Sequence, residues 1–150
     1  MYDEYLLSNF TISTDPGKLD IEVIHRYLTQ ESYWAQQISR ALVEKSIRHS
    51  FNFGLYHQHE QVGFARVVTD YATFALLCDV FILAAYRGQG LSRWLISVIV
   101  AHPELQGLRR FALYTKDAHT LYAPFGFSQI ADPTRAMEIK NTHPYGNAAP

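Results

Sequence analysis

The chain has 150 residues, with 13 Lys and Arg against 14 Asp and Glu, and a formal net charge of −1. This length fits one domain, and 48% hydrophobic with 18% charged residues is typical of a globular chain rather than a disordered one. The balanced charge gives no electrostatic reason to expect a nucleic-acid partner. Cys78 is the single cysteine, which excludes an internal disulfide and a cysteine-rich zinc site, so we expect no metal.

The ends of the chain carry no membrane or secretion signal that we recognise. No apolar run approaches the roughly 18 residues of a membrane span, and Met1-Tyr2-Asp3-Glu4 lacks the basic and then apolar order of a signal peptide. We therefore expect a cytoplasmic protein with no membrane partner. Residues 1–140 are expected to form one domain, and residues 141–150, which are polar with Pro and Gly, a disordered tail.

The first half of the chain predicts a strand, two helices and two further strands. Residues 10–14 alternate as a strand does, and Asp20 can cap a helix whose apolar residues recur at helical spacing. A second helix is predicted over residues 36–48. Residues 50–57 and 61–69 are typical of an antiparallel hairpin because a short polar turn separates two strand-like runs.

The second half begins with a longer apolar run over residues 73–83, in which Asp79 is the only charge, and this predicts a buried central strand. The later predicted elements are a helix over 91–101, a strand over 110–115, a short helix over 118–125, and final strands over 127–130 and 136–140. This order predicts an α/β (α+β) fold with a mixed, mostly antiparallel sheet of about six or seven strands and helices on both faces.

The turn between the central strand and the next helix reads Arg87-Gly88-Gln89-Gly90-Leu91-Ser92. A glycine-rich turn at a helix N-terminus points backbone N–H groups outward and adds the positive end of the helix dipole. Glycine also lets an anion approach the backbone, because it has no Cβ. The pattern fits a pyrophosphate site, and the alternative is a tight turn with no ligand.

These residues resemble the signature Arg/Gln-x-x-Gly-x-Gly/Ala of the GCN5-related N-acetyltransferase (GNAT) superfamily, with Ser92 at the last position. A second segment, residues 115–122 followed by Phe125-Gly126-Phe127, is similar to the late motif of that family, a Leu-Tyr pair before Gly-Phe. The resemblance spans about residues 61–139. It implies a GNAT-like (acyl-CoA N-acyltransferase) fold and an N-acetyltransferase that uses acetyl-coenzyme A (acetyl-CoA) as cosubstrate.

The resemblance also implies where acetyl-CoA binds. The pyrophosphate would lie on the backbone amides of residues 88–93. The pantetheine arm would pair with the main chain of residues 80–82, where the family strand bulges and splays from the next strand, here residues 111–115. The expected cofactor-binding residues are Val80, Phe81, Ile82, Arg87, Gly88, Gln89, Gly90, Leu91, Ser92, Arg93 and Asp117, the last standing where many members have Asn.

Tyr122 and Asp79 are the candidate catalytic residues. Tyr122 matches the tyrosine of the family's Leu-Tyr pair, so the resemblance places it near the cofactor sulfur, where a phenol can protonate the departing thiolate. The alternative is that it packs in the core. Asp79 is a charge inside an apolar strand, which is costly unless it serves a site or is paired. It is therefore either the base, directly or through water, or a structural ion pair or cap.

The acceptor pocket of the family is built from the first two helices and their connection. Tyr33 and Trp34 lie in that connection here, where an aromatic pair either walls a small apolar or cationic substrate or closes the core. Arg66 and Asp70 flank a strand and either pair with each other or reach the acceptor.

Three functions are compatible with these residues. The first is direct transfer of an acetyl group from acetyl-CoA to a primary amine of a small molecule. The others are a regulatory module that binds coenzyme A without catalysis, and acetylation of a protein lysine or N-terminus. The expected partner is a small-molecule amine, and the chain is expected to be a monomer or a homodimer.

Overall fold

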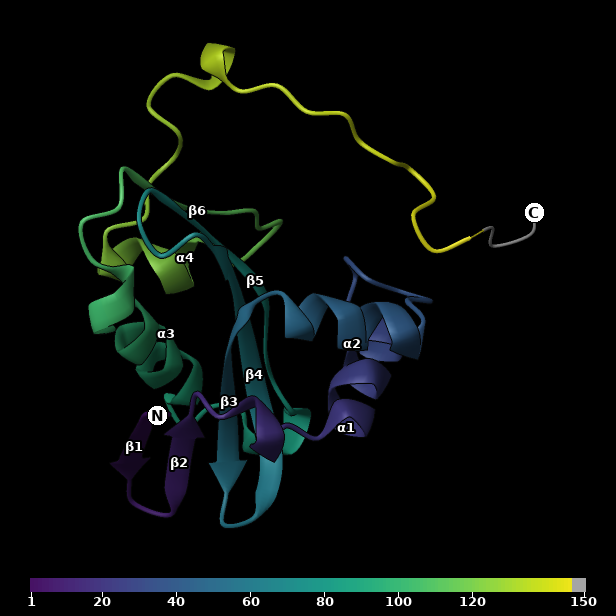
Figure 1. Cartoon of the computed structure of the whole chain (residues 1–150), viewed down its shortest axis with the longest axis vertical. Coiled ribbons are helices and arrows are strands. Elements are labelled where there is room, and N and C mark those ends of the chain that lie inside the picture. The colour runs from purple at the N-terminus through teal and green to yellow at the C-terminus, as the bar shows by residue number, and fades with distance from the viewer. Residues whose placement is uncertain (147–150) are drawn as a thin grey trace.

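The computed structural model describes residues 1–146 of the chain, and its centre is an open six-stranded sheet in the order β1-β2-β3-β4-β5-β6 (Figure 1). Neighbouring strands are antiparallel except for β5 and β6, which are parallel. This confirms the predicted mixed, mostly antiparallel sheet. The strands are β1 (Glu4–Leu7), β2 (Phe10–Ser13), β3 (Phe51–His57), β4 (Glu60–Thr69), β5 (Phe74–Ile82) and β6 (Arg110–Leu113).

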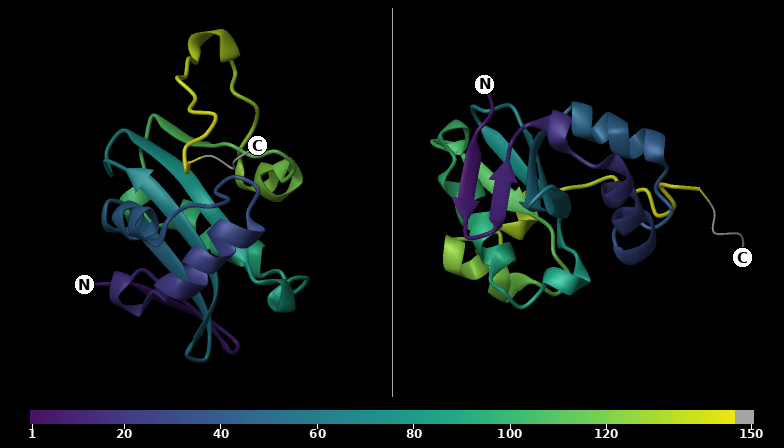
Figure 2. Two further views of the ribbon diagram at one scale, coloured as in Figure 1. Left: turned by 90° about the vertical axis from the view of Figure 1, so that its right-hand side faces the viewer. Right: turned by 90° about the horizontal axis from the view of Figure 1, so that it is seen from below.

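Helices cover both faces of the sheet, and Figure 2 shows α1 and α2 on one side with α3 and α4 on the other. The four helices are α1 (Ile21–Arg26), α2 (Arg40–Arg48), α3 (Leu91–Ala101) and α4 (His119–Tyr122). Fully buried Phe53 and Leu95 belong to the core on the α3 side, whereas Val43 and Phe64 belong to the core on the α2 side. Both faces of the central strands are therefore buried, which fixes their register.

The helices on the α2 side begin at side-chain caps. The Asp20 carboxylate accepts a hydrogen bond from the Val23 amide at 3.2 Å, as the sequence predicted for α1. The Ser39 hydroxyl accepts from the Leu42 amide at 3.3 Å, so α2 begins at Arg40 rather than at residue 36. Residues 32–39 are consequently a connection without helix, and this connection carries Tyr33 and Trp34.

Several predicted elements differ from the structure. The prediction of strands over 127–130 and 136–140 is wrong for the described chain, where both segments lie outside the sheet. Alternation identifies residues that suit a strand, but a strand also needs a paired neighbour. The predicted helix over 118–125 is shorter, because α4 is followed by a 3₁₀ turn and then by Gly126 with φ +98°. Strand β1 was not predicted.

The C-terminal segment returns to the folded body. Tyr145 is half-buried and packs against the core on the α2 side. Of the predicted disordered tail, residues 141–146 are described and are tied down at this tyrosine, and residues 147–150 lie outside the described chain.

Candidate active site

A β-bulge in β5 is the centre of the site. Ala65 of β4 faces two residues of β5, Asp79 and Val80, and Asp79 has φ +52°, a conformation that residues other than glycine seldom adopt. Leu77 and Val80 consequently both pack in the core on the α3 side, although they are three positions apart. In a regular strand Cys78 and Val80 would share a face, but the bulge interrupts the alternation here.

Strands β5 and β6 separate at the same level. Their pairing runs from Phe74 opposite Arg110 to Leu77 opposite Leu113, and ends there. The main chain of residues 80–82 therefore has no neighbour from β6, which is the splayed arrangement that the family resemblance implied.

A cavity of about 1390 Å³ opens at this separation. Its walls come from the α1–α2 connection, the end of β5, the turn into α3, and the segment from β6 to α4. The predicted site residues in its lining are Tyr33, Trp34, Asp79, Val80, Phe81, Ile82, Arg87, Gly88, Gly90, Leu91, Ser92, Asp117 and Tyr122. Gln89 and Arg93 were also predicted but are not part of the lining.

The turn into α3 presents unpaired backbone amides to the cavity. Gly88 and Gly90 have φ +80° and +78°, and Gly90 is the N-cap of α3 with no side-chain cap. Within the described residues, the amides of 88–93 donate no hydrogen bond to the chain. Free amides at the positive end of a helix suit an anionic ligand.

Two hydrogen bonds donated by the Arg87 side chain stabilise this turn. Its Nε donates to the carbonyl of Ile82 at 2.9 Å, and its Nη2 donates to the hydroxyl of Tyr27 at 3.1 Å. The ring of Tyr27 stacks on Phe81 with centroids 4.0 Å apart. The guanidinium thus ties the end of β5 to the first helical segment and fixes the turn on which the free amides lie.

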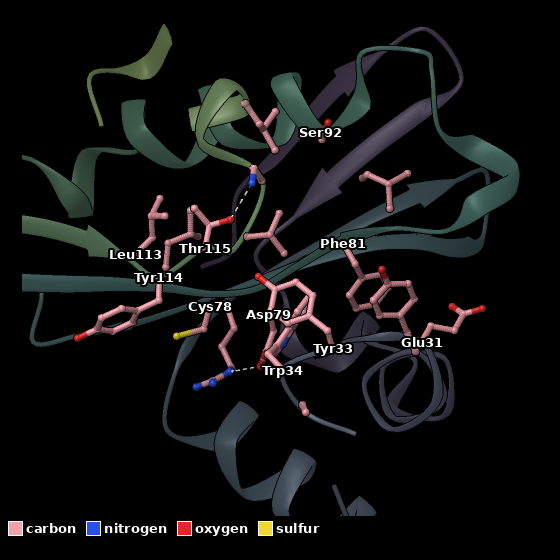
Figure 3. Close-up of a pocket in the computed structure, with 18 of the residues that line it drawn as sticks. Glu31, Tyr33, Trp34, Cys78, Asp79, Phe81, Ser92, Leu113, Tyr114 and Thr115 are labelled. Atoms are coloured by element: carbon pink, nitrogen blue, oxygen red, sulfur yellow. Dashed lines mark hydrogen bonds and ion pairs between the residues drawn. The ribbon is translucent and has the colours of Figure 1, made fainter. Parts of the chain in front are cut away.

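Asp79 lies at the other end of the cavity, in a cluster of polar contacts (Figure 3). Its Oδ1 accepts from Trp34 Nε1 at 2.8 Å, and its Oδ2 accepts from Arg66 Nε at 2.8 Å. The side chains of Asp79 and Arg66 are only 10% and 16% exposed, so the ion pair is shielded from water. The bulge aims the carboxylate into the cavity, and Arg66 and Trp34 hold it there.

The pairing of Arg66 with Asp70 does not form. Asp70 instead accepts hydrogen bonds from the Thr73 hydroxyl and from backbone amides after the turn between β4 and β5, which together lower the pKa of its carboxyl group. Sequence reasoning missed the Arg66–Asp79 pair, although the short gap between the predicted strands at 61–69 and 73–83 was the signal that could have placed them side by side.

Tyr122 is buried at the cavity wall, and its ring packs edge-on against Phe127 with centroids 6.0 Å apart. Burial raises the pKa of Tyr122 to about 12, because the phenolate would lose water. The phenol is therefore a proton donor throughout the neutral range.

Tyr33 connects the two walls of the cavity. Its hydroxyl accepts a hydrogen bond from the amide of Lys116 at 2.9 Å, and the Lys116 ammonium lies 5.6 Å from the centre of its ring. The ring of Trp34 packs edge-on against Tyr33 at 5.0 Å, and Figure 3 shows both beside Asp79. The α1–α2 connection thus spans from the acidic end of the cavity to the segment after β6.

Tyr145 is a lining residue that sequence reasoning did not find. Burial, together with the negative charge of Asp79, raises the pKa of its hydroxyl, whereas Arg66 opposes that shift. It therefore lies in the electrostatic field of the Asp79–Arg66 pair. No local pattern in the sequence links a tail residue to this pocket.

Two further observations concern the described residues. Residues 1–146 hold no group of three or more His, Cys, Asp or Glu side chains arranged to bind a metal ion. In the same part of the chain, none of the helices has the length and apolar character needed to cross a membrane.

Comparison with known proteins agrees with this geometry. The family profile described as "Acetyltransferase (GNAT) domain" matches residues 48–129. A proposed acetyltransferase of Gibberella zeae is 32% identical over 136 residues, which cover 76% of each chain. The crystal structure of a proposed GNAT-family acetyltransferase from Xanthomonas campestris pv. campestris is 48% identical, covers 95% of this chain and 100% of its own, and superposes with a TM-score of 0.91.

A more distant structure shares the fold. A GNAT family acetyltransferase from Elizabethkingia anophelis, solved with acetyl-CoA bound, is 14% identical over 81% of this chain and 78% of its own, with a TM-score of 0.61.

The family profile and the two more similar relatives show that the chain belongs to the GNAT family of acetyltransferases and is an acyltransferase. The turn at residues 87–92 led us to expect this family.

Proposed function

We propose that this enzyme transfers an acetyl group from acetyl-CoA directly to the primary amine of a small molecule. One observation carries the proposal: a single cavity is lined both by the turn into α3, whose amides are free, and by the carboxylate of Asp79 at the bulge of β5. An anionic cosubstrate suits the first end, and a cationic acceptor suits the second.

The cosubstrate end is matched to coenzyme A by its chemistry. The diphosphate would lie against the amides of residues 88–93, and the amide groups of the pantetheine arm would pair with the main chain of residues 80–82. Acetyl-CoA supplies an activated thioester when bound. The proposed contacts use the backbone, so they depend on the φ angles of Gly88 and Gly90 more than on side-chain identity.

The acceptor end is suited to an ammonium group. The carboxylate of Asp79 attracts a cation, and the rings of Tyr33, Trp34 and Tyr145 supply aromatic surface for cation–π contact. Each oxygen of Asp79 keeps a lone pair beyond the hydrogen bond it already accepts. The carboxylate can therefore take a proton from the bound ammonium, directly or through a water molecule.

Tyr122 is proposed to protonate the leaving group. As the bond from nitrogen to the acetyl carbon forms, the bond from that carbon to sulfur breaks, and sulfur leaves as a thiolate. Tyr122 gives its phenolic proton to sulfur, and the second proton that nitrogen loses on acylation restores the phenol, while the first proton, taken from the ammonium by Asp79, leaves to water. A donor whose pKa is raised to about 12 by burial is still protonated when the thiolate forms.

The shape of the acceptor end favours a small molecule over a protein. The hydrogen bond from Lys116 to Tyr33 crosses the cavity, and Tyr145 closes part of its wall. A peptide would need one of these contacts to open, whereas a small amine fits the enclosed space.

The proposal is tested by incubating the protein with acetyl-CoA and a panel of small primary amines, while free thiol and the mass of the acetylated amine are measured. We expect thiol release that depends on the amine and matches acetylated product one to one. Binding of coenzyme A without turnover of any amine would favour the regulatory module, and acetylation of peptides alone would contradict a small-molecule acceptor.

A further inference from the structure

One stripe of helix α2 lines the acceptor end of the cavity. Leu42, Lys45, Ser46 and His49 recur at the spacing of a single helix face, and all four belong to the cavity lining. The buried residues of α2 lie on a different stripe, which packs in the core on this side of the sheet. The helix therefore turns an apolar stripe to the core and a mostly polar stripe to the cavity.

Arg66 connects the cavity stripe of α2 to Asp79. Its Nε donates to Asp79 Oδ2 at 2.8 Å, and its Nη1 donates to the hydroxyl of Ser50 at 3.0 Å. Ser50 follows His49 directly in the chain, and Lys45 lies one helical turn before His49. The lining therefore runs from the carboxylate of Asp79, through the guanidinium of Arg66, to the basic residues at the end of the α2 stripe.

Positive charge exceeds negative charge in this part of the lining. Arg66 and Asp79 compensate each other as an ion pair. Lys45 is exposed and forms no ion pair within residues 1–146. Its ammonium is therefore an uncompensated cation at the cavity wall, and the imidazole of His49 adds a hydrogen-bond donor beside it.

The other acidic residues of the lining belong to different walls. Burial raises the pKa of Tyr27, Arg87 opposes that shift and the charge of Glu31 adds to it, so Glu31 lies near the phenol that Arg87 contacts. Figure 3 shows Glu31 well apart from Asp79. Asp117 lies on the segment between β6 and α4. A second ammonium on an acceptor would therefore meet a cation, not a carboxylate, at the α2 stripe.

We propose that the acceptor is a small primary amine that also carries a carboxylate, as amino acids do, and that Lys45 selects it. This inference rests on the proposed function, in which the amine meets Asp79. The carboxylate then lies against the Lys45 ammonium, and it can also accept from Arg66, whose guanidinium has N–H groups beyond the two hydrogen bonds above. One negative charge matches the one uncompensated cation, whereas an uncharged amine or a diamine leaves Lys45 unpaired.

The first test compares matched acceptors that differ in this charge alone. The α-amino acids, β-alanine and 4-aminobutyrate are each assayed beside their carboxamides, with simple alkylamines and diamines in the same panel, and free thiol is measured. We expect the best acceptor to be an acid whose kcat/KM exceeds that of its carboxamide by about ten-fold or more. If carboxamides, alkylamines or diamines are acetylated as well as the acids, this inference fails although the proposed function stands. If no amine is acetylated, the proposed function fails as well.

Substitution of Lys45 tests the residue itself. Lys45→Gln should reduce the preference for the best acid over its carboxamide by about ten-fold, through a higher KM for the acid, and Lys45→Glu should reverse the preference. The matched control is Arg48→Gln, which removes a cation from the same turn of α2 but outside the cavity lining, and it should keep the preference. Because Lys45 is exposed, its variants should keep the melting temperature of the unaltered protein. An unchanged preference in folded Lys45→Gln would overturn the proposal.

Binding of the acetylated product isolates the carboxylate contact from the contact at Asp79, because acetylation removes the positive charge of the amine. Calorimetric titration into the unaltered protein with coenzyme A present compares the N-acetyl form of the best acid with the N-acetyl carboxamide. We expect the acid to bind about ten-fold more tightly. Equal affinity for the two compounds would contradict a carboxylate site at Lys45.

Discussion

The two ends of the cavity are built in different ways. The cosubstrate end comes from one continuous stretch, residues 80–93, which forms the end of β5, the turn and the start of α3. The acceptor end is assembled from separate parts of the chain: the α1–α2 connection, β4, the bulge of β5, and Tyr145 near the C-terminus. In the proposed function, a local motif therefore binds the cosubstrate, whereas tertiary contacts assemble the part of the cavity that receives the acceptor.

Asp79 gives the largest expected effect, because we propose that it takes a proton from the acceptor amine. Asp79→Asn should lower kcat by about 1,000-fold, within the range for loss of general acid–base catalysis, and leave the KM for acetyl-CoA unchanged. Steady-state kinetics with a small amine measure both constants. An unaltered rate and pH profile in the variant would remove Asp79 from the proton step and leave it as an ion pair with Arg66.

Tyr122 lies where the two ends meet, and Tyr122→Phe should lower kcat by about 100-fold. The control Tyr71→Phe removes a hydroxyl outside the cavity lining and should be without effect. The same measurement should show equal loss with every amine of the panel, because the leaving thiolate is shared. A loss confined to one amine would instead assign Tyr122 to acceptor binding.

The raised pKa of Tyr122 also predicts a pH profile. Burial raises the pKa from 10.0 to about 12, so the phenol keeps its proton as pH rises through the neutral range and loses it only near the upper value. We expect no loss of kcat from this group below about pH 10, its unperturbed pKa. A fall in kcat near neutral pH that Tyr122→Phe abolishes would contradict the assignment.

A substitution at Gly90 tests the cosubstrate end of the cavity separately from the acceptor end. Gly90→Ala places a Cβ on a residue with φ +78°, which costs about 1–2 kcal/mol in the left-handed region and distorts the amides of the turn. We expect the KM for acetyl-CoA to rise about ten-fold, while the KM for the amine stays constant. Equal increases in both constants would mean that the two ends do not act separately.

Tyr145 gives the smallest expected effect and tests the acceptor side alone. Tyr145→Ala removes about 1 kcal/mol of cation–π attraction, which corresponds to about a five-fold higher KM for the amine. The KM for acetyl-CoA should not change. If the amine KM is also constant across the panel, Tyr145 packs against the core without touching the acceptor.

The same contrast explains what could be predicted from the sequence. The turn at residues 87–92 was recognised because its glycines and the following helix lie together in the sequence. The bulge at Asp79 could not be read from the apolar run, since alternation carries no signal for a single residue with positive φ. The partner of Arg66 was not found for a related reason: Asp70, one of the alternatives considered, is nearer in sequence, but Asp79 is nearer across the two paired strands.

The predicted strand at 136–140 illustrates another limit. Met137 and Ile139 alternate with polar or small residues in the sequence, but the chain offers this segment no neighbouring strand in the described residues. A pattern in one sequence specifies the face of a strand and not the strand that pairs with it.

The most direct test of the two-ended cavity is a crystal structure of the protein with coenzyme A bound. We expect the diphosphate on the backbone amides of residues 88–93, the pantetheine arm beside residues 80–82, and the sulfur within reach of the Tyr122 hydroxyl, with Asp79 beyond it. A diphosphate bound away from the start of α3, or a sulfur directed away from Tyr122 and Asp79, would contradict the account.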